Sequence, residues 1–164
     1  MELVILGSGG YGRTIYDIAE QLGYNPITVL DDSNPKMPLD SFEKYIAEDT
    51  CFIPAFGNNA FRLEWMNRIE NAGGRLTQLI HPTAYVSPRA IVESGTVVLP
   101  KAVINTGTKV GRGCIINIGA IVDHDCVLGE GVHIAPGAIV KGENEIQTLS
   151  KIDSGEVVDR GMMK

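Results

Sequence analysis

Residues 80–158 carry a branched aliphatic side chain at every sixth position without one exception. These positions are Ile80, Val86, Val92, Val98, Ile104, Val110, Ile116, Val122, Leu128, Ile134, Val140, Ile146, Ile152 and Val158. Four positions after each of them, as far as Ala138, stands a smaller side chain: Ala84, Ala90, Thr96, Ala102, Thr108, Cys114, Ala120, Cys126, Val132 and Ala138. A hexapeptide repeat predicts a parallel β-helix, because each hexad can form one strand and one corner, and three hexads can close one coil. We expect the large aliphatic side chains to fill the axis and the smaller ones to occupy the narrow part of each coil.

The residues just before the aliphatic positions should point outward, since side chains alternate between the two sides of a strand. Three hexads in a coil sort these outward residues into three columns. Two columns are largely apolar: Tyr85, Val103, Ile121 and Ile139 form one, and Leu79, Val97 and Ile115, followed by His133, form the other. Apolar columns of this extent need a cover.

The regular pattern weakens after Val140. Asn144, Ser150 and Glu156 take the positions of the smaller side chains, and charged residues become frequent. We therefore expect the regular β-helix to span residues 77–142. Residues 143–164 should form a short irregular tail with at most one further coil.

Residues 1–76 follow a different pattern, in which short apolar runs alternate with helical spacing. The sequence predicts strands at 2–6, 27–30 and 51–55 and helices at 11–22, 39–46 and 59–72. Alternating strands and helices indicate a small parallel sheet. We expect a small Rossmann-like domain of the α/β class before the all-β helix, with Pro54 marking an edge strand or a strand end.

A glycine-rich turn joins the first strand to the first helix. Its sequence, Gly7-Ser8-Gly9-Gly10-Tyr11-Gly12, has the G-x-G-x-x-G spacing, and Asp31 and Asp32 follow about twenty residues later. Such glycines let a pyrophosphate approach the backbone at a helix N-terminus, and the carboxylates can bind a ribose hydroxyl. A nucleotide-sugar fits better than NAD, because a dinucleotide normally needs two mononucleotide halves. The alternative is a tight turn without any ligand.

A second polar loop, Gly57-Asn58-Asn59, follows the third strand. Because ligands bind at the carboxyl ends of strands in open sheets, this loop should lie beside the glycine-rich turn. Its amides, and the guanidinium of Arg62 in the helix that follows, could hold a sugar or a phosphate. The alternative is that an asparagine only caps the next helix, and Asn59 is the favoured cap.

The β-helix carries two histidines of interest. His124 stands between Asp123 and Asp125 at a coil corner, where it can meet a substrate, and a carboxylate neighbour favours the charged imidazolium and can fix the tautomer. The alternative is a surface histidine without a role. His133 lies on an outward column and could serve a subunit interface or a ligand, whereas His81 at the module junction suits a structural role.

Composition excludes several classes of function. The net charge of −6 and the sequence pI near 5.0 argue against a nucleic-acid partner. No apolar run reaches membrane-spanning length, and the N-terminus lacks the basic and apolar regions of a signal peptide, so we expect a cytoplasmic protein. The three cysteines, Cys51, Cys114 and Cys126, suit buried positions, and the histidines and cysteines show no metal-ligand spacing.

With these residues in view, the chain resembles the sialic acid O-acetyltransferase and UDP-4-amino-sugar N-acetyltransferase family of hexapeptide-repeat sugar acyltransferases. The resemblance covers most of the chain up to Lys141 and rests on five segments: LVILGSGGYGR, LDD, FGNNAFR, IHPTAYVSPRA and NIGAIVDHDCVLGEGVHIAPGA. It implies a left-handed β-helix, a homotrimer that buries the apolar columns, and acetyl-CoA as co-substrate along the β-helix. Two departures stand out: Tyr11 replaces a frequent histidine, and relatives usually have several more coils.

The resemblance also implies roles for individual residues. The catalytic histidine falls on His124 and the acidic residue after it on Asp125. The second histidine, near the acyl donor, falls on His133, and we add Gly142 at the next corner as an acetyl-CoA contact. The nucleotide-sugar would bind at Gly7, Gly9, Gly10, Tyr11, Asp31, Asp32, Gly57, Asn58 and Asn59.

We therefore expect an acetyltransferase that moves an acetyl group from acetyl-CoA to an amine, or less favourably a hydroxyl, of a nucleotide-linked sugar. His124 would act as general base, with Asp125, or Asp123 in reserve, orienting the imidazole. Two alternatives stay open. One is a truncated, non-catalytic nucleotide-sugar-binding trimer subunit, and the other is a small dinucleotide-dependent oxidoreductase.

Overall fold

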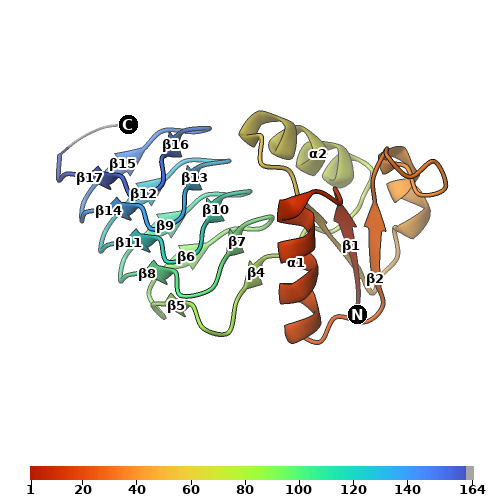
Figure 1. The fold of residues 1–164 in the computed structure, drawn as a ribbon, viewed down its shortest axis with the longest axis horizontal. Coiled ribbons are helices and arrows are strands. Elements are labelled where there is room, and N and C mark those ends of the chain that lie inside the picture. Colours follow the sequence, from red (N-terminus) through yellow and green to blue (C-terminus); the bar gives the residue numbers. More distant parts are fainter. Residues whose placement is uncertain (162–164) are drawn as a thin grey trace. The chain divides into compact units, whose positions relative to one another are not determined.

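The computed structural model describes residues 1–161, which form two compact units, Met1–Leu79 and residues from Ile80 onward (Figure 1). The first unit holds a three-stranded sheet and its helices, and the second is a parallel β-helix. Both folds agree with the prediction from the sequence.

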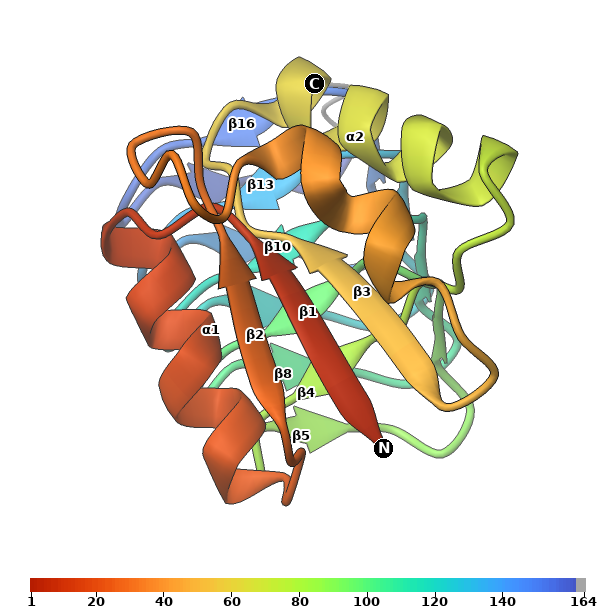
Figure 2. The ribbon, with the colours of Figure 1, turned by 90° about the vertical axis from the view of Figure 1, so that its right-hand side faces the viewer.

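The sheet of the first unit is parallel, with the strand order β2-β1-β3. Strand β1 (Glu2–Leu6) lies between β2 (Ile27–Leu30) and β3 (Thr50–Pro54), as Figure 2 shows. Residues 3–6 of β1 are fully buried, which explains the uninterrupted apolar run in the sequence. Pro54 ends β3, an edge strand, so its missing N–H disturbs no ladder.

The helices cover this sheet. They are α1 (Gly10–Gln21), the 3-10 helix η1 (Leu39–Tyr45) and α2 (Asn59–Asn71). Helix α1 buries one face, including Ile15, Ile18 and Ala19, and Gly23 follows its end with a φ of +79°. A left-handed residue of this kind commonly closes a helix, because glycine adopts it without a steric penalty.

The cap of α2 corrects one prediction. Asn58, not Asn59, is the N-cap, since its side chain accepts a hydrogen bond from the backbone N–H of Phe61 at 2.9 Å. Asn58 has the extended backbone of a cap, whereas Asn59 is already the first helical residue. The side chain of Asn59 instead accepts a hydrogen bond from the guanidinium of Arg62 at 2.9 Å.

The second unit consists of two-residue strands, and β4, at its start, begins at Leu79. The strands are β4 (Leu79–Ile80), β5 (Tyr85–Val86), β6 (Ile91–Val92), β7 (Val97–Val98), β8 (Val103–Ile104), β9 (Lys109–Val110), β10 (Ile115–Ile116), β11 (Ile121–Val122), β12 (Val127–Leu128), β13 (His133–Ile134), β14 (Ile139–Val140), β15 (Glu145–Ile146), β16 (Lys151–Ile152) and β17 (Val157–Val158). They form three sheets, with the orders β16-β13-β10-β7-β4, β17-β14-β11-β8-β5 and β15-β12-β9-β6. Each residue pairs with the residue eighteen positions later, as Ile115 does with His133, so three hexads make one coil.

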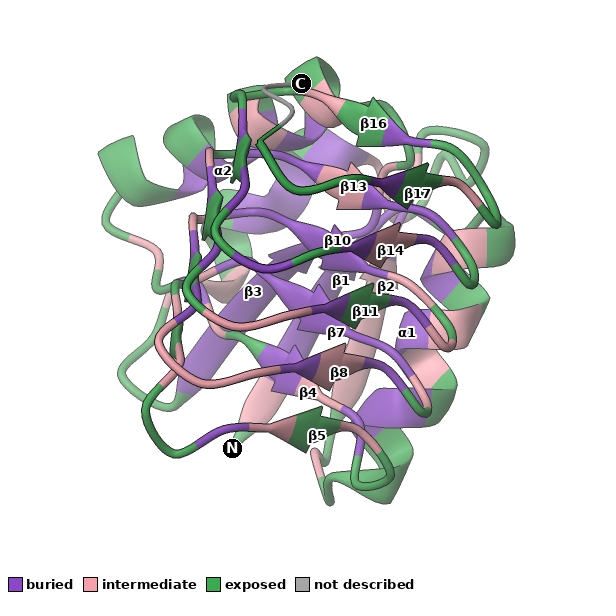
Figure 3. Cartoon of the chain, turned by 90° about the vertical axis from the view of Figure 1, so that its left-hand side faces the viewer, coloured by how far each residue is buried: buried purple, intermediate pink, exposed green. Residues whose placement is uncertain are grey.

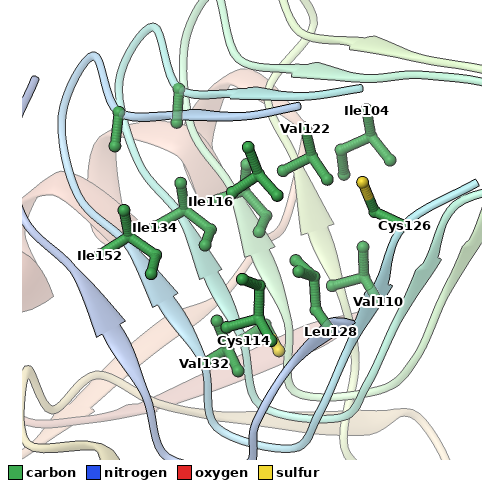
Figure 4. Packing of buried hydrophobic residues seen from close by; sticks show 14 of the residues in the cluster. Ile104, Val110, Cys114, Ile116, Val122, Cys126, Leu128, Val132, Ile134 and Ile152 are labelled. Carbon is green, nitrogen blue, oxygen red and sulfur yellow. The ribbon is translucent and has the colours of Figure 1, made fainter. Parts of the chain in front are cut away.

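The axis of the β-helix is a single column of apolar packing (Figure 4). The repeated aliphatic residues from Val98 to Val158 are at most 2% exposed. Some of the smaller inward residues are polar, and they form hydrogen bonds to the adjacent coil. The hydroxyl of Thr108 donates to the carbonyl of Asp123 at 2.6 Å, and the thiol of Cys126 donates to the carbonyl of Lys141 at 3.3 Å. Hydrogen bonding makes these buried polar atoms tolerable in an apolar core.

The β-helix continues for one further coil after residue 142, which is the most that the sequence predicted, but this coil is regular. Strands β15, β16 and β17 pair with the preceding coil as regularly as earlier strands do, so the prediction of an irregular tail was wrong for residues 143–158. Asn144 is 2% exposed, and its amide donates to the carbonyls of Lys141 at 2.9 Å and Asp159 at 3.0 Å. These bonds replace the tight packing of a small apolar side chain. Residues 162–164 of the expected tail lie outside the described residues.

The two apolar outward columns differ in exposure. In the first, Tyr85, Ile121 and Val157 are 55%, 37% and 46% exposed. They lie on β5, β11 and β17, and Figure 3 colours part of each of these strands as exposed. In the second, Leu79, Val97 and Ile115 are buried. The column on the sheet of β5 is therefore the one that still needs a cover.

Candidate active site

His124 lies at the corner between β11 and β12, as predicted. Its Nδ1 is 2.9 Å from the Asp125 carboxylate, and its side chain is 39% exposed. Asp125 adopts a φ of +55°, which aspartate tolerates better than most residues. The arrangement is a histidine–carboxylate pair in which one ring nitrogen is oriented and the other, Nε2, is available for chemistry.

Two glycines of the adjacent coils make room for this pair. A Cβ on Gly142 would lie 2.6 Å from Nε2 of His124, so the imidazole packs directly against the Gly142 backbone. A Cβ on Gly107 would collide with the carboxylate of Asp125. Gly142 is among the residues predicted from the sequence, whereas Gly107 is not, although it stands eighteen residues before Asp125 and that spacing could have identified it.

The charges around the corner favour the protonated imidazole. The hydrogen bond that Nδ1–H donates to Asp125 raises the pKa of His124 above its usual 6.5, and the negative charges of Asp123, Asp125 and Glu143 add to this. Glu143 forms an ion pair with Arg160, which holds the pKa of Glu143 below its usual value. His124 is consequently a stronger base than an isolated histidine.

Asp123 takes a different position from Asp125. Its Oδ1 accepts hydrogen bonds from the Asn105 amide at 2.9 Å and from the backbone N–H of His124 at 2.8 Å. The Asn105 bond is the main reason that the pKa of Asp123 is lowered, and the backbone N–H of Gly142 contributes too. Its Oδ2 lies 4.0 Å from Nε2 of His124, on the side opposite Asp125. Asn105 was not predicted from the sequence as a site residue.

His133 lies on β13, with Nε2 3.0 Å from the amide nitrogen of Asn117. The oxygen of that amide accepts the backbone N–H of Ile118 at 2.8 Å, which fixes its orientation. Asn117 therefore donates to Nε2, and the imidazole of His133 is neutral with its proton on Nδ1.

In the first unit, the glycine-rich turn borders a cavity of about 420 Å³. Most of the predicted ligand residues line it: Gly7, Gly9, Gly10, Tyr11, Asp31, Gly57 and Asn58. Gly12 lets α1 approach β1, since a Cβ there would collide with the Gly7 carbonyl. The two loops that the sequence analysis singled out thus meet at one cavity.

Asp31 and Asp32 were both predicted to bind the ligand, but they make different contacts. The oxygens of Asp31 accept the backbone N–H groups of Ser8 at 2.7 Å and Ser33 at 2.9 Å, and the bonds to Ser33 and Ser8 hold its pKa far below the usual range. Asp32 accepts the backbone N–H of Leu39 at 2.9 Å. Among the residues described, Asp32 and Asn59 do not line the cavity, so Asp31 is the carboxylate that faces it.

Sequence reasoning missed the aromatic wall of this cavity. Phe56 and Phe61 line it, with ring centroids 4.7 Å apart. Arg62 is buried, and its guanidinium donates to the carbonyl of Phe56 at 2.7 Å as well as to Asn59. The arginine thereby holds the loop that carries the wall.

Other kinds of site are not supported by the described part of the chain. Within residues 1–161, no group of three or more His, Cys, Asp or Glu side chains could hold a metal ion. The three cysteines are buried, and the imidazole of His81 is tied to Thr83 at 2.9 Å. No helix among the described residues has the length and apolarity to cross a membrane.

Two family models match the chain. Residues 2–69 match the PglD N-terminal domain, and residues 107–142 match the bacterial transferase hexapeptide of six repeats. The first match covers the unit with the glycine-rich cavity, and the second covers the coils that carry His124 and His133.

Individual proteins show the same likeness. UDP-N-acetylbacillosamine N-acetyltransferase from Bacillus subtilis (strain 168) is 30% identical over 110 residues, which span 59% of this chain and 50% of that protein. The chain thus matches about half the length of this relative.

Solved structures match over nearly the whole chain. The acetyltransferase domain of PglB from Neisseria gonorrhoeae FA1090 is 31% identical with a TM-score of 0.85, and the match covers 99% of this chain and 95% of that one. A second structure of that domain is a complex with acetyl coenzyme A. PerB from Caulobacter crescentus, in complex with CoA and GDP-perosamine, is 25% identical with a TM-score of 0.78, and the match covers 99% and 91% of the two chains. Together with the two family models, these likenesses show that the chain belongs to the hexapeptide-repeat sugar acyltransferases.

Proposed function

We propose that this protein transfers an acetyl group from acetyl-CoA to an amine of a nucleotide-linked sugar. The observation that carries the proposal is the pair of His124 and Asp125 at an open coil corner. Relatives named as N-acetyltransferases support the choice of an amine over a hydroxyl acceptor. Both co-substrates are metabolites of the cytoplasm, where the reaction would take place.

His124 is the general base of the proposed mechanism. The acceptor ammonium first loses one proton to water, because only a neutral amine can attack a thioester. As the new C–N bond forms, Nε2 of His124 takes the second proton, and it passes this proton to the thiolate as the C–S bond breaks. Asp125 holds Nδ1 and stabilises the imidazolium that exists between these events.

The acetyl-CoA would lie along the β-helix beside Gly142 and His133. Gly142 suits this role because its backbone, without a Cβ, lies against Nε2 of His124. His133, whose Nε2 lies 3.0 Å from the amide nitrogen of Asn117, would contact the acyl donor.

The nucleotide-sugar would bind in the cavity of the first unit. The glycine-rich turn before α1 suits a pyrophosphate, and Asp31, as an anion, can accept hydrogen bonds from a ribose or a base. The rings of Phe56 and Phe61 offer an apolar wall for the base. Asp32 and Asn59, which do not line the cavity, would support its loops rather than touch the ligand.

We infer a homotrimer as the working form. The column of Tyr85, Ile121 and Val157 supports this, since it leaves large apolar side chains exposed along one sheet of the β-helix. Light scattering of the purified protein should give the mass of three chains. The mass of one chain at micromolar concentration would contradict the trimer.

The decisive test is the release of free thiol from acetyl-CoA. The acceptors would be UDP- and GDP-linked sugars with an amine at C4, each paired with the sugar that carries a hydroxyl there. We expect thiol release with an amino-sugar and a loss of about 10²- to 10⁴-fold in kcat in His124→Ala, with little change in KM. Wild-type turnover in His124→Ala would refute the base, and no release with any acceptor would refute the function.

The alternative is a binding-only trimer subunit, which the sequence suggested because the chain has fewer coils than relatives usually have. It predicts binding of the nucleotide-sugar without binding of acetyl-CoA. The oxidoreductase hypothesis rested on the glycine spacing and Asp31. Its direct test is a thermal shift with NAD and NADP, in which we expect no change.

A further inference from the structure

Asp123 has no place in the mechanism above, although it faces the same space as the base. Asp125 already orients His124 through Nδ1. The Oδ2 of Asp123 lies 4.0 Å from Nε2, which is too far for a hydrogen bond between the two. Both side chains are 39% exposed, so a substrate can reach them.

The position of this carboxylate is built by its neighbours. Oδ1 accepts two hydrogen bonds, from the Asn105 amide at 2.9 Å and from the backbone N–H of His124 at 2.8 Å. The oxygen of Asn105 in turn accepts the backbone N–H of Thr106 at 2.8 Å, which fixes that amide as a donor. The carboxylate is therefore anionic and held in one orientation toward Nε2.

Nearby cations do not neutralise it. Lys141, in the same column of corners, pairs with Asp159 at 2.5 Å, and Arg160 pairs with Glu143. Among residues 1–161, Asp123 forms no ion pair with a lysine or an arginine, although its charge acts on Arg160 as well as on His124. The charge of Asp123 is left to act on whatever enters the site.

Two acceptors 4.0 Å apart suit a particular kind of donor. For a nitrogen about 2.9 Å from both Nε2 and Oδ2, the angle between the two acceptors at that nitrogen is roughly 90°. This is close enough to the tetrahedral angle for two of its N–H bonds to point at the two acceptors. An ammonium has three N–H donors and a neutral amine has two, whereas a hydroxyl has one. A hydroxyl could serve Nε2 or Oδ2 but not both.

We propose that Asp123 is a specificity-determining residue, which binds the acceptor nitrogen and makes the site select amines over hydroxyls. The inference rests on the proposed function and adds to it the residue that chooses the acceptor. Asp123 would first attract the ammonium by charge. It would then accept one N–H of the neutral amine while the other N–H points to Nε2 of His124.

The test is the variant Asp123→Asn. An amide oxygen can replace Oδ1 and keep the bonds from Asn105 and His124, so the fold and the base should stay in place. For the amino-sugar that the wild type acetylates, we expect KM to rise about tenfold to a hundredfold, as for the loss of a charged hydrogen bond, with a smaller fall in kcat. The sugar with a hydroxyl in place of the amine should inhibit wild type and variant with Ki values within about twofold.

Two other outcomes would overturn the proposal. An equal rise in the KM of the amine and the Ki of the hydroxyl compound would make Asp123 a structural residue, and an unchanged KM would mean that it does not touch the acceptor. Asp153→Asn, which removes a corner carboxylate paired with Lys151, is the matched control and should behave as wild type. Failure of the wild type to acetylate any amine would instead sink the proposed function itself.

Discussion

The coil corner of His124 and the strand of His133 place the same side chain in opposite surroundings. At the corner, Nδ1 faces a carboxylate at 2.9 Å, and the pKa of His124 is raised. On β13, Nε2 faces the amide nitrogen of Asn117 at 3.0 Å, so the imidazole of His133 must be neutral. The surroundings of His124 favour uptake of a proton, whereas those of His133 favour one neutral tautomer.

The difference shows that the partner of an imidazole, more than its exposure, determines what it can do. A carboxylate stabilises the charged form, whereas a fixed N–H donor excludes it. The backbone explains why each partner is available. At the corner, the left-handed backbone of Asp125 places its carboxylate beside His124. On the flat face, the neighbours of His133 come from the adjacent coils, and Asn117 directly follows β10 in the preceding coil.

The largest effect is expected from Gly142→Ala, which should displace the imidazole of His124 and leave His133 unchanged. The added Cβ would lie 2.6 Å from Nε2, so the imidazole must move. Because a displacement of about 1 Å can cost about 10²-fold in rate, we expect kcat to fall by about that factor. Steady-state kinetics would measure the loss, and thermal unfolding would measure any loss of stability.

A double variant separates the clash from a general defect. In His124→Ala the imidazole is absent, so adding Gly142→Ala should cost little further stability. If Gly142→Ala lowers the melting temperature equally with and without His124, the glycine is needed for the coil itself. The packing of the imidazole on Gly142 would then be irrelevant.

Asp125→Asn removes the negative charge beside His124 while keeping a side chain of the same shape. Asp125 raises the pKa of His124, and the base works only when unprotonated, so loss of the charge should shift the acidic limb of kcat/KM to lower pH. The rate on the plateau should fall about tenfold, because a neutral hydrogen bond supports the imidazolium less well. A pH–rate profile measures both effects. An acidic limb that stays in place would mean that another group controls it.

The periodic parts of the molecule could be read from the sequence because periodicity is imposed by geometry. A coil of three hexads admits only large aliphatic side chains on its axis, so the strands fall where the repeat predicts. The failure at Asn144 has a physical cause. Its amide satisfies two carbonyls of the structure, Lys141 and Asp159, and no rule of size or polarity reveals that from the sequence.

The candidate site was only partly predictable for a similar reason. The sequence placed His124 and Asp125 at a corner, but Asn105 and Gly107 belong to the coil before it and became visible only through contacts. The spacing of eighteen residues was the available signal. In the first unit, Asp31 and Asp32 look alike in sequence, and only the folded loop decides which of them faces the cavity.

The smallest effect is expected from Asn117→Asp, which gives His133 the partner that His124 has. One carboxylate oxygen would still accept the backbone N–H of Ile118, and the other would face Nε2 as an acceptor. Nε2 must then carry a proton, so the pKa of His133 should rise. Since Nδ1–H is retained, we expect the KM of acetyl-CoA to change by no more than about threefold. Nitrogen NMR of the imidazole would follow the proton directly, and a wild-type His133 that is protonated at Nε2 near neutral pH would contradict the contrast between the two histidines.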